Sequence, residues 1–337
     1  MEKYSQFRDR GSGISPFIPS STPTSTFQTL LRSFVFLFRL PLFVSYCAVY
    51  FLFLSPLGRV LRLPLACRKL LLWGMLGIPG VWWVDLQLDG VKRGSLSQQP
   101  PSRVPHPGSV IAAQFTSPVD ALYLAAIFDP VFAVSYPRTR KVRRVSLFQA
   151  IALALSPPAL EPSPADARKL TTLRALVEQN PHRVVAVFPE MSTTNGKGIL
   201  PFSPSLLSAP AEAKIFPVSM RYTPPDITTP VPGAYATFLW NLLSRPTHCI
   251  RVRIADAVLN APAAAAAAAS RSSVDGVFDE ADGDGGYAQQ EEDLTPDEKR
   301  VLDRVGEDLA RLARNKRVGL TLRDKIAFID AWNKGRK

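Results

Sequence analysis

The feature that most constrains this chain is a long apolar stretch without any charged residue, which runs from residue 40 to residue 58. Its 19 residues are close to the roughly 20 that an α-helix needs to cross the hydrocarbon core of a bilayer. A second apolar piece at 70–84 is shorter and carries three tryptophans, which favour the interface between water and lipid. We therefore predict that residues 28–93 anchor the protein to a membrane. A buried core helix is the alternative.

Positive charge lies on both sides of this stretch, so the excess of basic residues expected in cytosolic loops gives no orientation. One full span and an interfacial hairpin with both ends in the cytosol are equally compatible with the pattern. The flanking basic residues are Arg32, Arg39, Arg59, Arg62, Arg68 and Lys69.

The rest of the chain divides by composition. Residues 1–27 are polar and rich in Ser, Thr and Pro, which is typical of disorder. From 94 to 260, short apolar runs alternate with helical patterns, which predicts an α/β domain. Residues 261–293 are a low-complexity insertion rich in alanine and then in acidic residues, and 294–337 predict helices that complete the domain. Strands are expected at 110–114, 131–135, 184–188, 214–221 and 249–254, and helices at 119–128, 144–154 and 165–179.

The net charge of +12 is unevenly distributed. Residues 271–298 hold ten acidic residues and one basic residue, which leaves +21 on the remainder. Such a body can face nucleic acid, an anionic membrane surface or a phosphate-bearing substrate. The basic residues lack interleaved aromatic residues and accompany an apolar segment, so we expect no nucleic-acid partner. Three widely spaced cysteines and three histidines without helical pairing predict neither a disulfide framework nor a metal site.

The most informative block is FPEMSTTNGKG at 188–198. An apolar strand leads into a carboxylate, Glu190, and then into small polar residues that end in two glycines around a lysine. Such a loop can offer backbone N–H groups, hydroxyls and an ammonium group to a phosphate. An ordinary polar turn is the alternative. The predicted phosphate-binding residues are Thr193, Thr194, Asn195, Gly196 and Lys197.

A second block, AAQFTSPVDA at 112–121, places Thr116, Ser117 and Asp120 between a strand and a helix. Together the two blocks resemble the glycerophospholipid acyltransferase family, whose first block is Asn-His-x-x-x-x-Asp and whose third is Phe-Pro-Glu-Gly-Thr. The residues of the two blocks are more similar to those of the fungal lysophosphatidic acid acyltransferases once assigned to vacuolar protein sorting. The resemblance covers roughly 105–260 and 294–335, and FPVSMRYTPPD at 216–226 is similar to the family's fourth block. It implies a mixed sheet flanked by helices.

The resemblance implies that Asp120 and Glu190 are the catalytic carboxylates of the first and third blocks. In the family, a histidine five residues before the aspartate takes the proton of the acceptor hydroxyl, and the aspartate orients that imidazole. Here that position holds Phe115, which accepts no proton.

Three accounts of this difference stay open. Another base serves: His106, His182, His248, or one of the two carboxylates directly. Alternatively, the reaction is driven mostly by positioning and an oxyanion site. In the third account, the domain binds lipid without reacting. We expect His106 and His182 at the wrong end of their strands.

A basic run, SYPRTRKVRRVS at 135–146, follows a predicted strand where the family's second block would bind the acceptor phosphate. Guanidinium groups pair bidentately with phosphate, so Arg138, Arg143 and Arg144 are predicted to bind substrate, together with Thr116, Ser117, Lys197 and Arg221. A solvated basic turn near anionic lipid is the alternative.

The resemblance implies a membrane-bound enzyme that moves an acyl group from acyl-CoA to lysophosphatidic acid. Its location would be the endoplasmic reticulum membrane or the lipid-droplet surface. The expected partners are a lysophospholipid, acyl-CoA as cosubstrate and a lipid surface, with no cofactor; the oligomeric state is left open. The alternative is an inactive acyltransferase-fold protein that binds lipid in droplet organisation or membrane trafficking.

Overall fold

A computed structural model describes residues 2–61, 63–92, 94–260 and 294–335. The predicted low-complexity insertion, 261–293, lies outside the described residues. The described chain is built around one mixed sheet of eight strands in the order β1-β9-β8-β2-β6-β3-β4-β5. Central strands β8, β2, β6 and β3 are parallel, and antiparallel pairs flank them. The strands are β1 (Val81–Leu88), β2 (Val110–Ala113), β3 (Val131–Ser135), β4 (Val142–Val145), β5 (Leu170–Thr171), β6 (Val185–Val187), β8 (Ile215–Thr223) and β9 (His248–Ile254).

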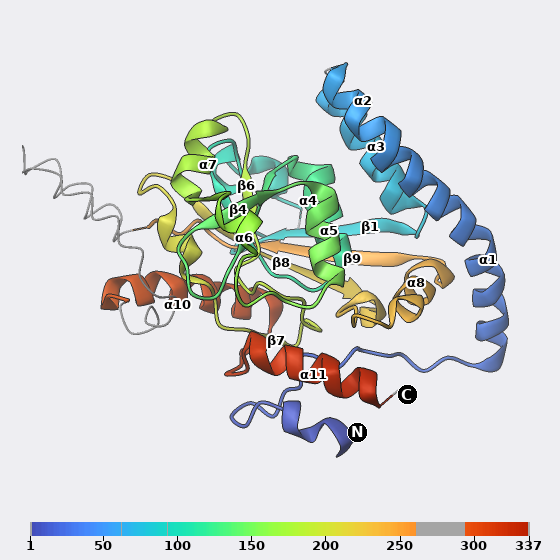
Figure 1. The fold of residues 1–337 in the computed structure, drawn as a ribbon. Helices are drawn as coiled ribbons and strands as arrows, with labels where there is room; N and C mark the ends of the chain where they lie inside the picture. Colours follow the sequence, from blue (N-terminus) through green and yellow to red (C-terminus); the bar gives the residue numbers. More distant parts are fainter. Residues whose placement is uncertain (1, 62, 93, 261–293, 336–337) are drawn as a thin grey trace, which may run out of the picture.

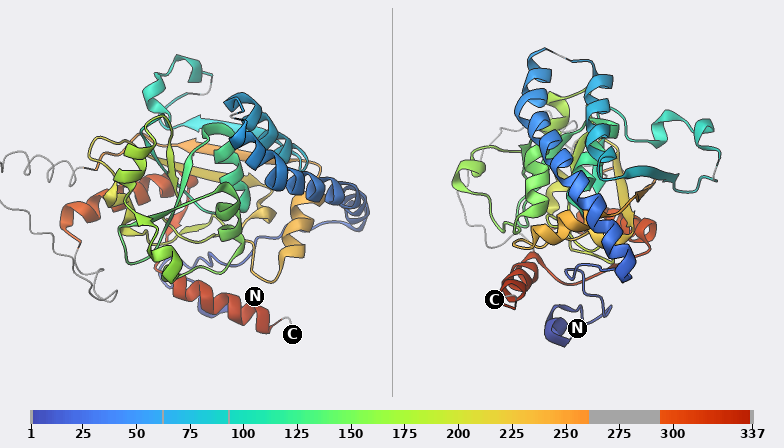
Figure 2. Two further views of the ribbon diagram at one scale, coloured as in Figure 1. Left: turned by 45° about the horizontal axis from the view of Figure 1, so that its top comes forward. Right: turned by 90° about the vertical axis from the view of Figure 1, so that its right-hand side faces the viewer.

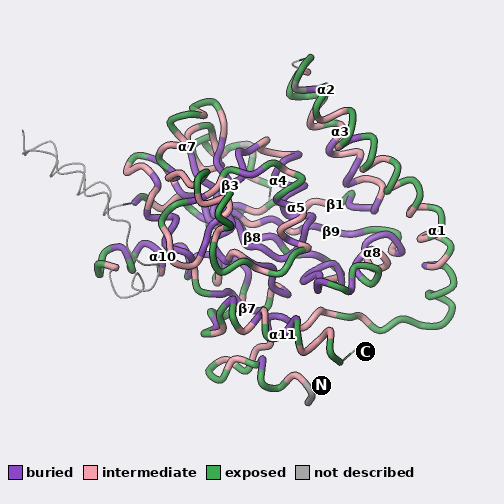
Figure 3. The backbone as a smooth tube through the Cα atoms, viewed as in Figure 1, coloured by how far each residue is buried: buried purple, intermediate pink, exposed green. Residues whose placement is uncertain are grey.

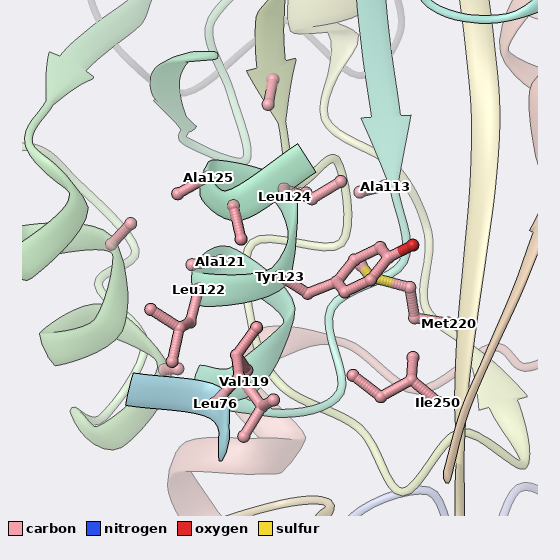
Figure 4. Packing of buried hydrophobic residues seen from close by; sticks show 14 of the residues in the cluster. Leu76, Ala113, Val119, Ala121, Leu122, Tyr123, Leu124, Ala125, Met220 and Ile250 are labelled. Carbon is pink, nitrogen blue, oxygen red and sulfur yellow. The ribbon is translucent and has the colours of Figure 1, made fainter. Parts of the chain in front are cut away.

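Helices cover both faces of this sheet (Figure 1). Helices α3 (Leu65–Gly77), α4 (Pro118–Phe128) and α5 (Leu147–Leu155) cover one face, and α7 (Leu173–Gln179) and α10 (Pro296–Ala313) cover the other. Figure 4 shows side chains of α4 packed with Leu76 of α3 and with Met220 and Ile250 of the sheet. Strands β2 and β6 are buried along their whole length, because helices shield both faces of the sheet, and Figure 3 shows the buried centre of the domain. This arrangement confirms the predicted α/β class.

Helix α4 begins where its sequence predicts. Pro118 occupies its first turn, and Ser117 and Asp120 form a capping box in which each side chain bonds the other residue's backbone. A capping box of Thr295 and Glu298 begins α10 in the same way. The last helix, α11 (Leu322–Lys334), starts at a third capping box, that of Thr321 and Asp324. Smaller elements are α6 (Pro164–Ala167), α8 (Tyr235–Ser244) and the two-stranded sheet of β7 (Gly198–Ile199) and β10 (Lys316–Arg317).

The long apolar stretch is helical throughout. Helix α1 (Thr26–Val49) continues through a π-helical segment, Tyr50–Leu54, into α2 (Ser55–Val60). The helix Thr26–Gly58 is long and apolar enough to cross a membrane, and only 6% of its most apolar window is buried. Figure 2 shows α1 running along the outside of the domain beside α8. It is tied there by Arg32, which donates to Ser244 Oγ, and by Arg39, which donates to the carbonyls of Pro79, Arg245 and Pro246.

The N-terminal segment differs from the predicted disorder. Residues Glu2–Phe7 form a 3-10 helix, and the ring of Phe17 is fully buried. Together with Phe7 it packs against Phe328 of α11, so the two terminal segments lie side by side (Figures 1 and 2). The composition signal was wrong here because a few apolar residues within a polar segment suffice to dock it on another element.

Three further boundaries are corrected. β1 lies inside the predicted anchor, 28–93, yet it pairs with β9 at the sheet edge, with Trp82 and Trp83 exposed. Part of the predicted basic turn is strand β4, so the helix expected at 144–154 starts at Leu147. The helix expected at 165–179 is divided by β5 into α6 and α7. In each case the segment is too short for its spacing of apolar and polar residues to distinguish a strand from a helix.

Candidate active site

Two loops and the end of a third strand meet at one edge of the sheet. The first loop leaves β2, carries Phe115 and leads into Asp120 in the first turn of α4. The second loop leaves β6 and carries Glu190, and β8 ends beside them with Tyr222. Since β2, β6 and β8 are parallel, their carboxyl ends share one edge of the sheet, the usual place for a site in such folds. The structure therefore brings together the two blocks that the sequence singled out.

Asp120 is completely buried and its carboxylate is surrounded by donors. It accepts hydrogen bonds from Thr116 N at 2.6 Å, Ser117 N at 2.8 Å and Thr116 Oγ1 at 3.0 Å. Its other oxygen accepts from the hydroxyl of Tyr222. Burial raises the pKa of Asp120 to about 6, against the lowering effect of these bonds. Thr116 and Ser117, both predicted to bind substrate, thus hold Asp120 and begin α4.

The partner of Asp120 is therefore a phenol rather than an imidazole. Burial raises the pKa of Tyr222 well above its usual value, and the neighbouring Asp120 charge raises it further. Tyr222 lies in the sequence block similar to the family's fourth, but sequence reasoning gave it no role. Only the tertiary structure shows that it reaches Asp120.

Phe115 packs as a core residue. Its ring stacks on that of Phe188 with the centroids 4.3 Å apart, and both line a small apolar cavity of about 30 Å³ that Met191 also borders. No proton acceptor stands at the position of the family's base.

Two of the three histidines lie at the opposite edge of the sheet. His106 precedes β2 and packs on Phe216, and His182 is exposed before β6, so both sit at the amino ends of strands, as predicted. His248 is buried at the start of β9, where its Nε2 lies 2.9 Å from the carbonyl of Leu242. Burial lowers its pKa to about 4, which keeps it neutral. These placements favour neither His106 nor His182 as a replacement base.

Glu190 joins the loops. Its Oε1 accepts from Phe115 N at 3.4 Å and its Oε2 accepts from Leu200 N at 3.1 Å. The side chain is completely buried, which raises its pKa to about 8, and the charge of Asp120 adds to this effect. Glu190 thus fixes the backbone of the loop after β2, which carries the first sequence block, relative to the loop after β6, which carries Glu190 itself.

Lys325 of α11 is a buried group beside this loop that sequence reasoning missed. Its ammonium donates to the carbonyl of Thr193 and, at 2.8 Å, to Thr193 Oγ1. Burial lowers its pKa to about 7, while the charge of Glu190 raises it. One signal was available: Lys325 lies three residues after Leu322 and four before Ile329, on the apolar face of an amphipathic helix.

The loop after Glu190 uses its polar groups within the protein. Thr194 N donates to the carbonyl of Phe115, and Asn195 Nδ2 donates to the carbonyls of Ser15 and Ile18. Gly196 adopts a positive φ of 68°, and its carbonyl accepts from Asn315. Lys197 is exposed. Phosphate binding by Thr193, Thr194, Asn195, Gly196 and Lys197 stays a prediction, and the described contacts give the first three a role in holding the loop.

The predicted basic residues are dispersed. Arg143 pairs with Asp166 at 2.8 Å, and Arg144 is exposed on β4. Arg221 alternates with Tyr222 on β8, so it points to the other face of the sheet, where it donates to the carbonyl of Ala313. Arg138 borders a cavity of about 290 Å³.

This larger cavity lies beside Glu190. Met191 and Leu200, on either side of the loop, form part of its wall, and Met191 also borders the smaller apolar cavity. Its charged lining residues are Arg138, Arg323 and Glu161, and its further lining residues are Pro137, Leu160, Pro201, Phe202, Thr321 and Leu322. Arg323 comes from α11 and was not predicted. Within the described ranges, no three His, Cys, Asp or Glu side chains gather to hold a metal ion.

Comparisons with known proteins agree with this picture. The protein of Schizosaccharomyces pombe named "Putative lysophosphatidic acid:oleoyl-CoA acyltransferase" is 30% identical over 258 residues, 75% of this chain and 83% of that protein. "Lysophosphatidic acid:oleoyl-CoA acyltransferase 1" of Saccharomyces cerevisiae is 24% identical over 60% of this chain and 61% of that protein. No family model matches the chain.

Among solved structures, PlsC from Thermotoga maritima, a 1-acyl-sn-glycerophosphate acyltransferase, aligns with 83% of this chain and 97% of its own. The TM-score is 0.39 and the identity 14%.

The described residues thus form an α/β protein with two buried carboxyl groups at the carboxyl edge of its sheet. By its similarity to the yeast proteins, the chain belongs to the family of fungal lysophosphatidic acid acyltransferases. The resemblance read from its two sequence blocks is confirmed.

Proposed function

We propose that the protein transfers a fatty acyl group from acyl-CoA to lysophosphatidic acid and so makes phosphatidic acid. The observation that carries the proposal is the 30% identity over 258 residues to a protein named for this reaction. In the reaction, the acceptor hydroxyl oxygen attacks the thioester carbonyl, the C–S bond breaks, and the hydroxyl proton leaves with the CoA thiol.

The cavity of about 290 Å³ is the proposed place for the acceptor's phosphate. Arg138 and Arg323 supply two guanidinium groups on its wall, and such groups form strong charge-assisted bonds with phosphate oxygens. Leu160, Met191 and Phe202 offer apolar surface to the rest of a lysophospholipid. This assignment retains Arg138 from the sequence prediction and adds Arg323.

The proposed mechanism relies on positioning rather than on an imidazole base. Phe115 accepts no proton, and the Asp120 carboxylate already accepts from Thr116, Ser117 and Tyr222. General-base assistance contributes a factor of roughly 10² to 10⁴, so we expect turnover to be slower by about that factor than in a relative with the histidine. Holding the two substrates together supplies the remaining acceleration.

Membrane attachment is part of the proposal. The helix Thr26–Gly58 leaves large apolar side chains exposed, among them Phe34, Phe38 and Phe53, and both substrates carry acyl chains. Lipid surroundings would cover these side chains at a gain of about 25 cal/mol per Å². The endoplasmic reticulum membrane or the lipid-droplet surface is the proposed location, because the substrates are lipids.

The test is release of free CoA by the purified protein in detergent with oleoyl-CoA and one acceptor at a time. We expect release with lysophosphatidic acid that exceeds release with lysophosphatidylcholine by at least about tenfold, since only the former presents a phosphate monoester. Arg323→Gln should raise the KM for lysophosphatidic acid about tenfold, the cost of roughly one charge-assisted bond. Arg300→Gln, a change in a surface pair of α10, is the matched control.

Equal release without any acceptor would contradict the proposal, because it would mean that the protein hydrolyses the thioester. No release with any acceptor would also contradict it and would favour the lipid-binding alternative.

A further inference from the structure

Lys325 makes an unusual set of contacts for a lysine. Its side chain is 2% exposed, although lysines are almost never fully buried unless paired. Its ammonium donates twice to Thr193, to the carbonyl and to the hydroxyl, and lies 6.0 Å from the centre of the Phe17 ring. Three segments far apart in sequence therefore meet at one charge: the N-terminal segment, the loop after Glu190 and α11.

Among the described groups, Glu190 is the one whose charge, when it is ionised, raises the pKa of Lys325, and Lys325 in turn lowers the pKa of Glu190. The two groups are not within ion-pair distance, so the effect acts through space and through the Thr193 backbone that lies three residues after Glu190. Burial of a charged lysine costs free energy, because the ammonium group loses its hydration. An apolar residue at this position of α11 would pack at a lower cost.

We propose that Lys325 is a positioning residue of the acyltransferase site, which holds the loop 190–195 against α11 and thereby fixes Glu190 beneath the first-block loop. This inference rests on the proposed function for its kinetic consequence but not for its structural one. Lys325 borders neither of the two cavities next to Glu190, so the inference gives it a role in positioning the loop rather than in binding substrate.

The geometry explains how α11 reaches the site. Glu190 holds Phe115 N and Leu200 N, and Leu200 borders the larger cavity. Movement of the loop 190–195 lengthens these two hydrogen bonds. The backbone at Phe115 and the cavity wall at Leu200 then shift together. A change at Lys325 should therefore lower kcat, which depends on alignment, more than it changes the KM for either substrate.

The experiment compares Lys325→Met with Lys334→Met, the same change on an exposed lysine of the same helix. For Lys325→Met we expect kcat to fall at least about tenfold while the KM values for lysophosphatidic acid and oleoyl-CoA stay within about twofold. Hydrogen exchange of the backbone at 192–198 should become at least about tenfold faster. The control should match wild type in all three measurements.

A second variant, Thr193→Val, removes only the acceptor hydroxyl. If Lys325 acts through this loop, Thr193→Val lowers kcat in the same direction but less; if Thr193 instead binds phosphate, the KM for lysophosphatidic acid rises with kcat unchanged. Unchanged exchange at 192–198 in Lys325→Met would overturn the inference, as would a KM effect without a kcat effect. An inactive wild type would contradict the proposed function, while hydrogen exchange would still decide the role of Lys325.

Discussion

Replacing Glu190 by glutamine should weaken the dependence of stability on pH. In the folded protein the pKa of Glu190 is raised from 4.5 to about 8, so the folded state keeps a proton that the unfolded state releases above about pH 4.5. A raised pKa contributes stability that is complete below the unfolded value and is lost as pH rises toward the folded value. Between pH 5 and pH 6.5 the wild type should therefore lose about 1.4 kcal/mol per pH unit through this group, about 2 kcal/mol in all.

Glutamine carries no such proton, so its contribution to stability is constant over this range. The amide offers one oxygen where the carboxyl group offers two, so either Phe115 N or Leu200 N loses its acceptor. At pH 5 we expect Glu190→Gln to be less stable than wild type by about 1–3 kcal/mol, the cost of one unsatisfied buried donor. By pH 6.5 the difference should shrink by about 2 kcal/mol. The window stops there because Lys325, with a pKa of about 7, begins to lose its proton and acts in the opposite direction.

The assay is urea unfolding in detergent micelles, followed by tryptophan fluorescence at several pH values. Glu178→Gln is the matched control, because Glu178 lies on the surface of α7 with 65% of its side chain exposed. The reasoning is refuted if the free-energy difference between wild type and Glu190→Gln stays constant from pH 5 to pH 6.5. A constant difference would mean that Glu190 is ionised in the folded protein throughout.

Three further predictions follow from the same contacts. Tyr222→Phe removes one of the donors to the buried Asp120, so it should lower the free energy of unfolding by about 1.5–3 kcal/mol, measured by urea unfolding at pH 8. Phe115→His should raise the rate of CoA release less than about threefold, because Tyr222 occupies the Asp120 oxygen that would orient the new imidazole; a gain near the 10² expected of a general base contradicts this. The full chain should stay in the membrane pellet after alkaline carbonate extraction, and deletion of 26–60, which spares α3, should release it to the supernatant.

The sequence was sufficient for the central architecture. The strands expected at 110–114, 131–135, 184–188, 214–221 and 249–254 all exist within two residues, because they are apolar runs bounded by turn residues. Asp120 and Glu190 were assigned from the family resemblance, and the structure places both after the parallel strands β2 and β6. Short or polar elements were missed: β4 carries two arginines, and β5 has two residues, too few to show a period.

The supporting residues of the site could not be predicted from local pattern. Tyr222 and Asp120 are 102 residues apart in sequence, and Lys325 and Thr193 are 132 apart. Contacts at such separations depend on tertiary packing, which a strand or helix pattern does not encode. The loop 193–197 was interpreted as open to ligand because its residue types suit phosphate, whereas Asn195 uses the same amide to bind the N-terminal segment.

Transfer of an isotopically labelled acyl chain tests the central claim most directly. Purified protein in detergent receives deuterated oleoyl-CoA and lysophosphatidic acid, and mass spectrometry follows labelled phosphatidic acid over time. Our account predicts labelled product in proportion to enzyme and time, unchanged in Phe115→Ala to within about tenfold because Phe115 supplies no proton acceptor. Absence of labelled phosphatidic acid above the level of heat-denatured protein would contradict it.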